Sequence, residues 1–151
     1  MEKSQEWKKL PFTDKYLYDT NSLSSTFLST IYPAKEVKTG KIVILKEMKP
    51  KERRSPEIIR REVNHTTKAQ SSGNKYLVHL LDSHDMLDDV KNKKAYLFLK
   101  YYTDGDLGKY LEKKPGKKLD EDHALSLFAK ICEGYNWLAM NDIVHRDLKP
   151  A

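Results

Sequence analysis

The stretch that decides the fold is His145-Arg146-Asp147-Leu148-Lys149-Pro150-Ala151, the last seven residues of the sequence. It sets an imidazole, a guanidinium, a carboxylate and an ammonium close together along the chain. A solvated surface loop of ordinary polar residues is the alternative interpretation of this stretch. Its interpretation depends on whether the upstream sequence supplies matching elements in a matching order.

Two helices are predicted immediately upstream. Apolar residues recur at helical spacing between Asp120 and about Met140, and they are Ala124, Phe128, Ile131, Tyr135 and Leu138. Asp120 is a favourable cap for the start of this helix, and Asp106 is a favourable cap for a shorter helix over residues 107–113. The apolar pair Ile143-Val144 then leads from the longer helix into the charged stretch.

Strands and one helix are predicted in the first two thirds of the chain. Runs rich in β-branched and aromatic residues predict strands over residues 16–19, 27–37, 42–48, 77–82 and 95–101. A helix is predicted over residues 56–70, because Ser55 suits the N-cap and Pro56 the first helical position. Three strands, a helix, two strands and two helices predict an α+β fold, with a small antiparallel sheet followed by a helical region.

In this setting the terminal stretch resembles the catalytic loop of protein kinases, and its Lys-Pro resembles the serine/threonine-specific branch. The resemblance implies that Asp147 orients the substrate hydroxyl and accepts its proton, and that Lys149 reaches toward the transferred phosphate. It divides the chain into a polar tail (1–15), a kinase N-lobe (16–102), and a hinge exit with a truncated C-lobe (103–151). The family pattern next needs an Asn at position 152, so we expect the chain to be an incomplete kinase fragment.

A nucleotide site is implied by the same resemblance. Lys46 lies in Val43-Ile44-Leu45-Lys46, where the family has Val-Ala-Ile-Lys, and Glu62 in Arg60-Arg61-Glu62-Val63 is its expected partner from the following helix. The alternatives are a solvent-exposed strand lysine, and a solvent-facing Glu62 paired with Arg61 or Lys68. The resemblance implies ATP as the cofactor, contacted by the backbones of Lys100 and Tyr102, by the ribose-binding Asp106, and by Ile31 and Ile44. Mg²⁺ is expected for the complete family domain, but both of its family ligands fall beyond residue 151, so no metal site is expected here.

Three departures from the family pattern affect this site. The chain has no glycine before Gly40, and the three glycine positions of the phosphate-covering loop fall on Ser24, Thr26 and Ser29. Side chains there hinder close approach of the backbone to phosphate, although their hydroxyls offer hydrogen-bond donors. Ile44 replaces the usual small Ala, and period-2 alternation puts it on the same strand face as Lys46, over the adenine. Thr66 stands where the family helix usually offers an apolar residue.

Composition excludes several other classes of function. The net charge is +6, but the basic residues are scattered and accompany no nucleic-acid motif, so no nucleic-acid partner is expected. No apolar run is long enough to span a membrane. The single cysteine, Cys132, cannot form an internal disulfide, and the N-terminus has no signal core, so an intracellular, cytoplasmic location is expected.

Three functions follow in order of preference. The first is a protein serine/threonine kinase, acting on a protein substrate and present here as a fragment that is inactive alone. The second is a truncated pseudokinase that acts as a binding or regulatory module, with a protein partner covering the helix over residues 120–140. The apolar residues of this helix cannot all be covered by the N-lobe, so a partner is expected to cover them. The third, indicated by charge alone, is a nucleic-acid-binding protein, which salt-insensitive or absent binding of nucleic acid would exclude.

Overall fold

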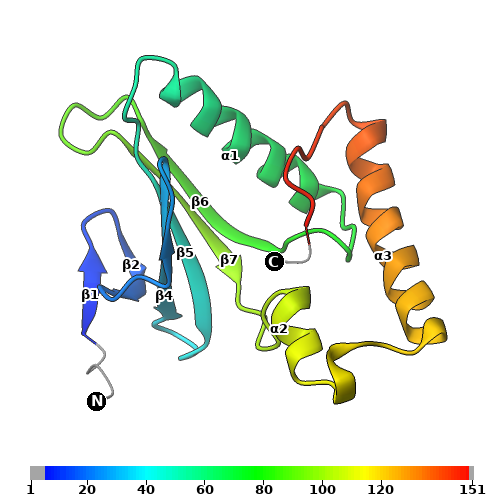
Figure 1. Ribbon diagram of the computed structural model, residues 1–151. Helices are drawn as coiled ribbons and strands as arrows, with labels where there is room; N and C mark the ends of the chain where they lie inside the picture. Colours follow the sequence, from blue (N-terminus) through cyan, green and yellow to red (C-terminus); the bar gives the residue numbers. More distant parts are fainter. Residues whose placement is uncertain (1–5, 150–151) are drawn as a thin grey trace. The chain divides into compact units, whose positions relative to one another are not determined.

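The computed structural model describes residues 6–149 and divides the chain into two compact units (Figure 1). The first unit combines the chain up to Ser71 with Val78–Tyr101, and the second combines Ser72–Leu77 with the chain from Tyr102 onward. The first unit holds the sheet and one helix, and the second holds two further helices.

The sheet of the first unit is antiparallel throughout and has the strand order β1-β2-β4-β5-β7-β6, with the short β3 paired to β4. Its strands are β1 Trp7–Leu10, β2 Thr13–Asp19, β3 Ser24–Ser25, β4 Ser29–Glu36, β5 Ile42–Met48, β6 Leu80–Met86 and β7 Lys94–Lys100. Strand β5 has the predicted bounds. The turn between β4 and β5 contains Gly40 with φ of 71°, a conformation that glycine adopts without steric cost.

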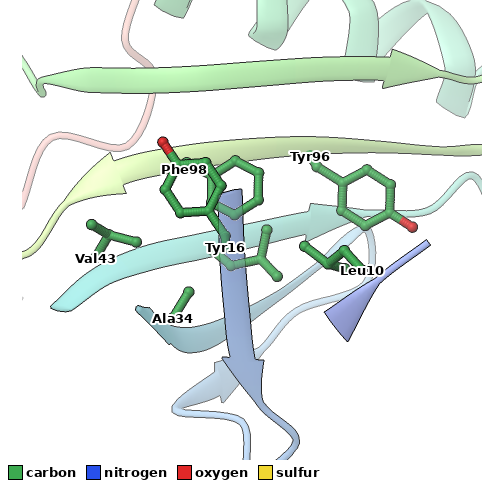
Figure 2. Packing of buried hydrophobic residues seen from close by; sticks show 7 residues of the cluster. Leu10, Tyr16, Ala34, Val43, Tyr96 and Phe98 are labelled. Atoms are coloured by element: carbon green, nitrogen blue, oxygen red, sulfur yellow. The ribbon is translucent and has the colours of Figure 1, made fainter. Parts of the chain in front are cut away.

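One face of the sheet carries a core rich in aromatic side chains. The rings of Tyr16 and Phe98 stack with centroids 3.9 Å apart, although β2 and β7 are not neighbours in the sheet (Figure 2). Leu10, Ala34, Val43, Leu45 and Tyr96 complete this buried cluster. Lys15 of β2 also pairs with Asp82 of β6 at 3.1 Å, which joins the second strand of the order to the last. The sheet is therefore strongly curled around this aromatic core.

The other face of the sheet is covered in part by α1, Ser55–Ser71, which lies against β6 and β7 (Figure 1). Ile59 and Val63, one helical turn apart, are buried against a second cluster of sheet residues, which are Met48, Leu80, Leu87, Ala95 and Leu97. Strand β5 contributes to both cores, because successive side chains of a strand point to opposite faces. Val43 and Leu45 enter the aromatic core, and Met48 enters the core beneath α1.

The prediction of a polar tail over residues 1–15 was wrong for its described part. Residues 7–10 form β1, and β2 begins at Thr13 rather than at Tyr16. Leu10 is buried, and Phe12 packs on Tyr96 with ring centroids 4.5 Å apart. The sequence conceals this strand because β1 is an edge strand whose lysines face solvent, as is common at sheet edges.

Two further predictions need correction. Strand β6 runs over Leu80–Met86 rather than residues 77–82, because its polar residues pair with β7 at the opposite edge of the sheet. The hydroxyl of Ser55 accepts hydrogen bonds from the backbone N–H groups of Glu52 and Lys51, at 3.0 and 3.3 Å. Ser55 is thus the first helical residue and orders the preceding loop, instead of capping a later N–H group of α1.

The second unit contains α2, Leu107–Glu112, a 3-10 turn over Pro115–Lys117, and α3, Glu121–Met140. Both predicted caps are present: Asp106 accepts from the N–H of Lys109 and Asp120 from the N–H of His123, each at 2.8 Å. Gly134 lets α3 approach the segment that holds Tyr76, because a Cβ added there would lie 2.9 Å from the Tyr76 carbonyl oxygen. Within residues 6–149 no helix is both long and apolar enough to cross a membrane.

Candidate functional site

Lys46 lies on the face of the sheet that α1 covers. In the strand register it stands opposite Ile31 of β4 and opposite Leu97 of β7. Its side chain is 23% exposed, so the ammonium is partly withdrawn from water. An ammonium between apolar strand neighbours needs an anionic partner to offset the cost of its desolvation.

Glu62 of α1 supplies that partner by accepting a hydrogen bond from Nζ of Lys46 in a part-buried ion pair. Glu62 reaches the sheet because it is one turn away from Ile58 and Thr66 and adjoins the buried stripe of Ile59 and Val63. The hydroxyl of Thr66 donates to the Glu62 carbonyl at 2.8 Å, so this polar residue is satisfied by its own helix. Glu62 therefore pairs with Lys46 and not with Arg61 or Lys68.

An apolar surface adjoins the ion pair on the same face of the sheet. Ile44 precedes Lys46 by two residues on β5 and stands opposite Leu99 of β7 and Pro33 of β4. Ile31 and Ile44 are only partly buried, unlike the core residues of the opposite face. A partly open apolar surface beside a held ammonium suits a ligand that joins a flat apolar ring to an anion.

The hairpin that links β3 to β4 carries the hydroxyls found at the glycine positions of the family pattern. The hydroxyls of Thr26 and Ser29 bond to each other at 2.9 Å, and the N–H of Thr26 donates to the Ser29 carbonyl at 2.7 Å. Ser25 and Thr30 form a further hydroxyl pair at 3.2 Å. None of residues 24–29 has a positive φ, so this hairpin forms without glycine. Several hydroxyls of the loop are thus engaged within the loop itself.

The predicted catalytic residues Asp147 and Lys149 lie in the second unit. Their side chains form an exposed ion pair, with Lys149 Nζ 3.0 Å from Asp147 Oδ2. The N–H of Asp147 donates to Nδ1 of His145 at 3.3 Å, and Arg146 between them has φ of 63°. A left-handed conformation at a non-glycine residue stores strain of a kind that is common at functional sites. Ile143 is buried and its N–H donates to the Leu138 carbonyl at 2.9 Å, which ties the loop to the end of α3.

The remaining predicted contacts lie at Lys100, Tyr102 and Asp106. The N–H of Lys100 donates to the His79 carbonyl at 2.9 Å, and the Tyr102 carbonyl accepts from the N–H of Gly105 at 3.1 Å. Asp106 caps α2, and the hydrogen bond from the Lys109 N–H lowers the pKa of its carboxyl group below the usual value. This hydrogen bond therefore favours the ionised form of the Asp106 carboxylate.

Sequence reasoning missed the groups that tie α1 to the sheet outside the two cores. Arg60 pairs with Asp85 and Asp88, and Oε1 of Gln70 accepts from the Leu80 N–H at 2.9 Å. Arg60 and Asp85 are 25 residues apart, and no local pattern indicates their contact. Among residues 6–149, no group of three or more His, Cys, Asp or Glu side chains gathers in a way that would hold a metal ion.

Comparison with known families decides the affiliation. The family model described as protein kinase domain matches residues 25–151, which include Lys46, Glu62 and Asp147. This chain belongs to the protein kinase family. Its matched range begins after β2, yet β2 pairs with β4 and places Tyr16 in the aromatic core, so the sheet of this kinase domain extends beyond the matched residues.

Several curated kinases are similar to this chain. The serine/threonine-protein kinase nrc-2 of Neurospora crassa is 28% identical over 120 residues, covering 80% of this chain and 18% of the relative. The DNA damage response protein kinase DUN1 of Saccharomyces cerevisiae is 28% identical over 151 residues, covering 98% of this chain and 28% of the relative. Cyclin-dependent kinase 4 of Xenopus laevis is 31% identical over 123 residues, covering 80% and 38%.

The chain holds part of a eukaryotic-type serine/threonine protein kinase domain, and it spans between 18% and 38% of the length of these three relatives. Members of the family use ATP with Mg²⁺ and act on protein substrates. The α+β fold that the sequence predicts is confirmed by the kinase domain match and by the antiparallel sheet followed by helices.

Proposed function

We propose that this chain is the ATP-binding part of a protein serine/threonine kinase, whose complete domain transfers the γ-phosphoryl group of ATP to Ser or Thr hydroxyls of a protein. The single observation that carries the proposal is the Lys46–Glu62 ion pair beside the partly open apolar surface of Ile31 and Ile44. In this proposal Ile31 and Ile44 pack against the adenine, and the backbones of Lys100 and Tyr102 contact its edge. Nothing in the assignment of the adenine contacts depends on the side chain of Lys100.

The phosphates are assigned to Lys46. Its ammonium donates charged hydrogen bonds to phosphate oxygens, and Glu62 holds the ammonium in one position while the nucleotide enters. Asp106 is assigned to the ribose hydroxyls. It caps α2 through Oδ1, and its Oδ2, which lies 3.5 Å from the exposed ammonium of Lys109, keeps a lone pair to accept from a hydroxyl.

Asp147 is assigned as the group that orients the substrate hydroxyl and accepts its proton, and Lys149 as a cation for the transferred phosphate. No step is assigned to Mg²⁺, because neither of the two side chains that hold the metal in the family matches a residue of this sequence.

A regulatory or binding module is the second candidate function, and two observations favour it. The hydroxyls of Thr26 and Ser29 bond to each other in the hairpin where the family presents glycines to phosphate. Helix α3 also exposes large apolar side chains on one side: Leu125 is 59%, Phe128 62% and Tyr135 45% exposed. In this candidate a protein partner with an apolar surface covers α3.

Titration of the 151-residue chain with a fluorescent ADP analogue separates the two candidates. If the ATP site is correct, Lys46→Met weakens binding about ten- to hundredfold, the equivalent of one charged hydrogen bond of about 1.5–3 kcal/mol. Lys94→Met is the matched control, because Lys94 pairs with Glu47 at 2.9 Å and is similarly buried, but belongs to the opposite face of the sheet. Absence of binding in the unmodified chain, or equal binding by Lys46→Met, refutes the ATP site and leaves the binding module.

A further inference from the structure

The residues that hold α1 on the sheet include an arginine that lies outside the predicted site. Nε of Arg60 is 3.3 Å from Oδ2 of Asp85, and its Nη2 is 2.6 Å from Oδ2 of Asp88. Asp85 belongs to β6, and Asp88 lies in the loop between β6 and β7. A guanidinium presents several donors in one rigid plane and can bridge two carboxylates, whereas an ammonium acts as a point charge.

The acceptor loop is itself held in place. Oδ1 of Asp85 accepts from the Leu87 N–H at 3.0 Å, and Leu87 is buried in the core beneath α1. Oδ1 of Asp89 accepts from the N–H groups of Lys91 and Asn92, at 2.8 and 3.2 Å. Asp85 therefore presents its second oxygen to Arg60 from a fixed point on the sheet.

The positions of Arg60 and Glu62 on the helix explain why both are needed. Residues advance by about 100° around an α-helix, so Arg60 and Glu62 lie about 80° to either side of the buried stripe of Ile59 and Val63. Glu62 ties one flank of α1 to β5 through Lys46, and Arg60 ties the other flank to β6 and the following loop. Apolar packing along the stripe resists separation from the sheet but resists rolling about the helix axis only weakly, because it is non-directional.

We propose that Arg60 is a positioning residue: by binding Asp85 and Asp88 it fixes the rotation of α1 so that Glu62 meets Lys46. Arg60, on the opposite flank of α1, then controls whether the Lys46–Glu62 ion pair forms at the candidate ATP site. The consequence for nucleotide binding rests on the proposed function, whereas the rotation of α1 is testable without nucleotide.

The test uses the full chain and a zero-length carbodiimide cross-linker, which joins a carboxylate to an amine only when the two are in contact. Mass spectrometry gives the yield of the Lys46–Glu62 link relative to the Lys94–Glu47 link, which reports a contact within the sheet. Arg60→Gln lowers this ratio at least about threefold, as expected for loss of two exposed ion pairs. Arg61→Gln is the matched control, because Arg61 makes no ion pair with any residue among 6–149 and the same charge is removed from the same helix.

A charge exchange distinguishes positioning from general stability. Arg60→Glu lowers the ratio further, and adding Asp85→Asn and Asp88→Lys restores it. The flank is then again joined by opposite charges, and the amide at position 85 keeps an oxygen for the Leu87 N–H. An unchanged ratio in Arg60→Gln overturns the proposal, and so does a charge exchange that fails to restore the ratio. Loss of both cross-links in Arg60→Gln also overturns it, since Arg60 would then support the whole sheet. Failure of the ADP titration alone refutes the ATP site and leaves the role of Arg60 standing.

Discussion

Replacing Gly134 by alanine tests how α3 packs within its unit. In an isolated helix the substitution stabilises by about 1 kcal/mol, because alanine has the higher helix propensity. In this fold the new Cβ would lie 2.9 Å from the Tyr76 carbonyl oxygen and 3.4 Å from the Tyr76 Cβ. The closest neighbour is a backbone atom, which cannot swing away as the end of a side chain can. Relief needs a shift of about 0.5 Å between α3 and the Tyr76 segment, and overpacking of this kind costs about 1–3 kcal/mol.

The sign of the change in unfolding free energy therefore shows whether α3 packs on the Tyr76 segment. We expect Gly134→Ala to lower the free energy of unfolding by about 1 kcal/mol, the overpacking cost less the helix-propensity gain. The measurement is urea denaturation followed by circular dichroism, with hydrogen exchange to assign the loss to α3. Ser126→Ala on the exposed side of α3 is the control, and it is expected to gain a few tenths of a kcal/mol. A Gly134→Ala protein more stable than its parent would show that α3 does not pack on Tyr76.

Two further predictions concern pH. The hydrogen bond from the His123 N–H lowers the pKa of Asp120. This cap therefore stabilises α3 fully above the unfolded pKa of the carboxyl group, and the stabilisation is lost as pH falls through the lower folded pKa. Asp120→Asn should keep the cap at low pH, so the helical circular dichroism signal should fall less on acidification than in the parent. Burial raises the pKa of Tyr96, so its contribution is complete below the unfolded pKa of about 10 and declines as pH rises above it. Tyr96→Phe should therefore reduce the alkaline loss of stability in denaturation series, and an unchanged alkaline limb would refute this account.

The sequence predicts best those elements whose residue propensities, caps and apolar periodicity indicate the same structure. Strand β5 was predicted with its observed bounds because Ile42, Val43, Ile44 and Leu45 are β-branched or apolar, and the strand is paired along both edges, with β4 and β7. Helix α3 was predicted to within one residue, because its cap and its apolar period agree. In β5 local propensity and strand pairing favour the same structure, and in α3 the cap and the helical period favour the same bounds.

The edge strands could not be predicted in the same way. Strand β1 has two exposed lysines between its apolar ends, and β6 carries Asp82, Ser83, His84 and Asp85 in succession. Their strand structure comes from hydrogen bonding to neighbours and from contacts across the curled sheet, such as the ring of His84 against Phe12 at 4.9 Å. These contacts depend on how the sheet curls, which the local sequence does not encode.

In the candidate site, too, some contacts were predictable from local sequence and others were not. The pairing of Lys46 with Glu62 was predictable from the helical phase of Glu62 and from the resemblance of both motifs to kinases. The bridge from Arg60 to Asp85 was not predictable, because it depends on the register of β6 against β7, which shifts between Leu80 and Asp82. A shift of one residue in a strand exchanges the faces of all the side chains that follow it.

The ion pairs Lys94–Glu47 and Lys46–Glu62 lie on opposite faces of the sheet, and comparing them shows which observations support the functional assignment. Lys94 and Glu47 stand on adjoining strands beside the buried Tyr96, on the face of the sheet that carries the aromatic core. Lys46 and Glu62 join a strand to a helix, next to apolar residues that are only partly buried. Part-buried ion pairs are weak evidence for stability, since apolar replacements are often as stable. The assignment of the ATP site to Lys46 therefore rests on the open apolar surface and on the helix that must be held in place, and the Lys94→Met control tests that distinction directly.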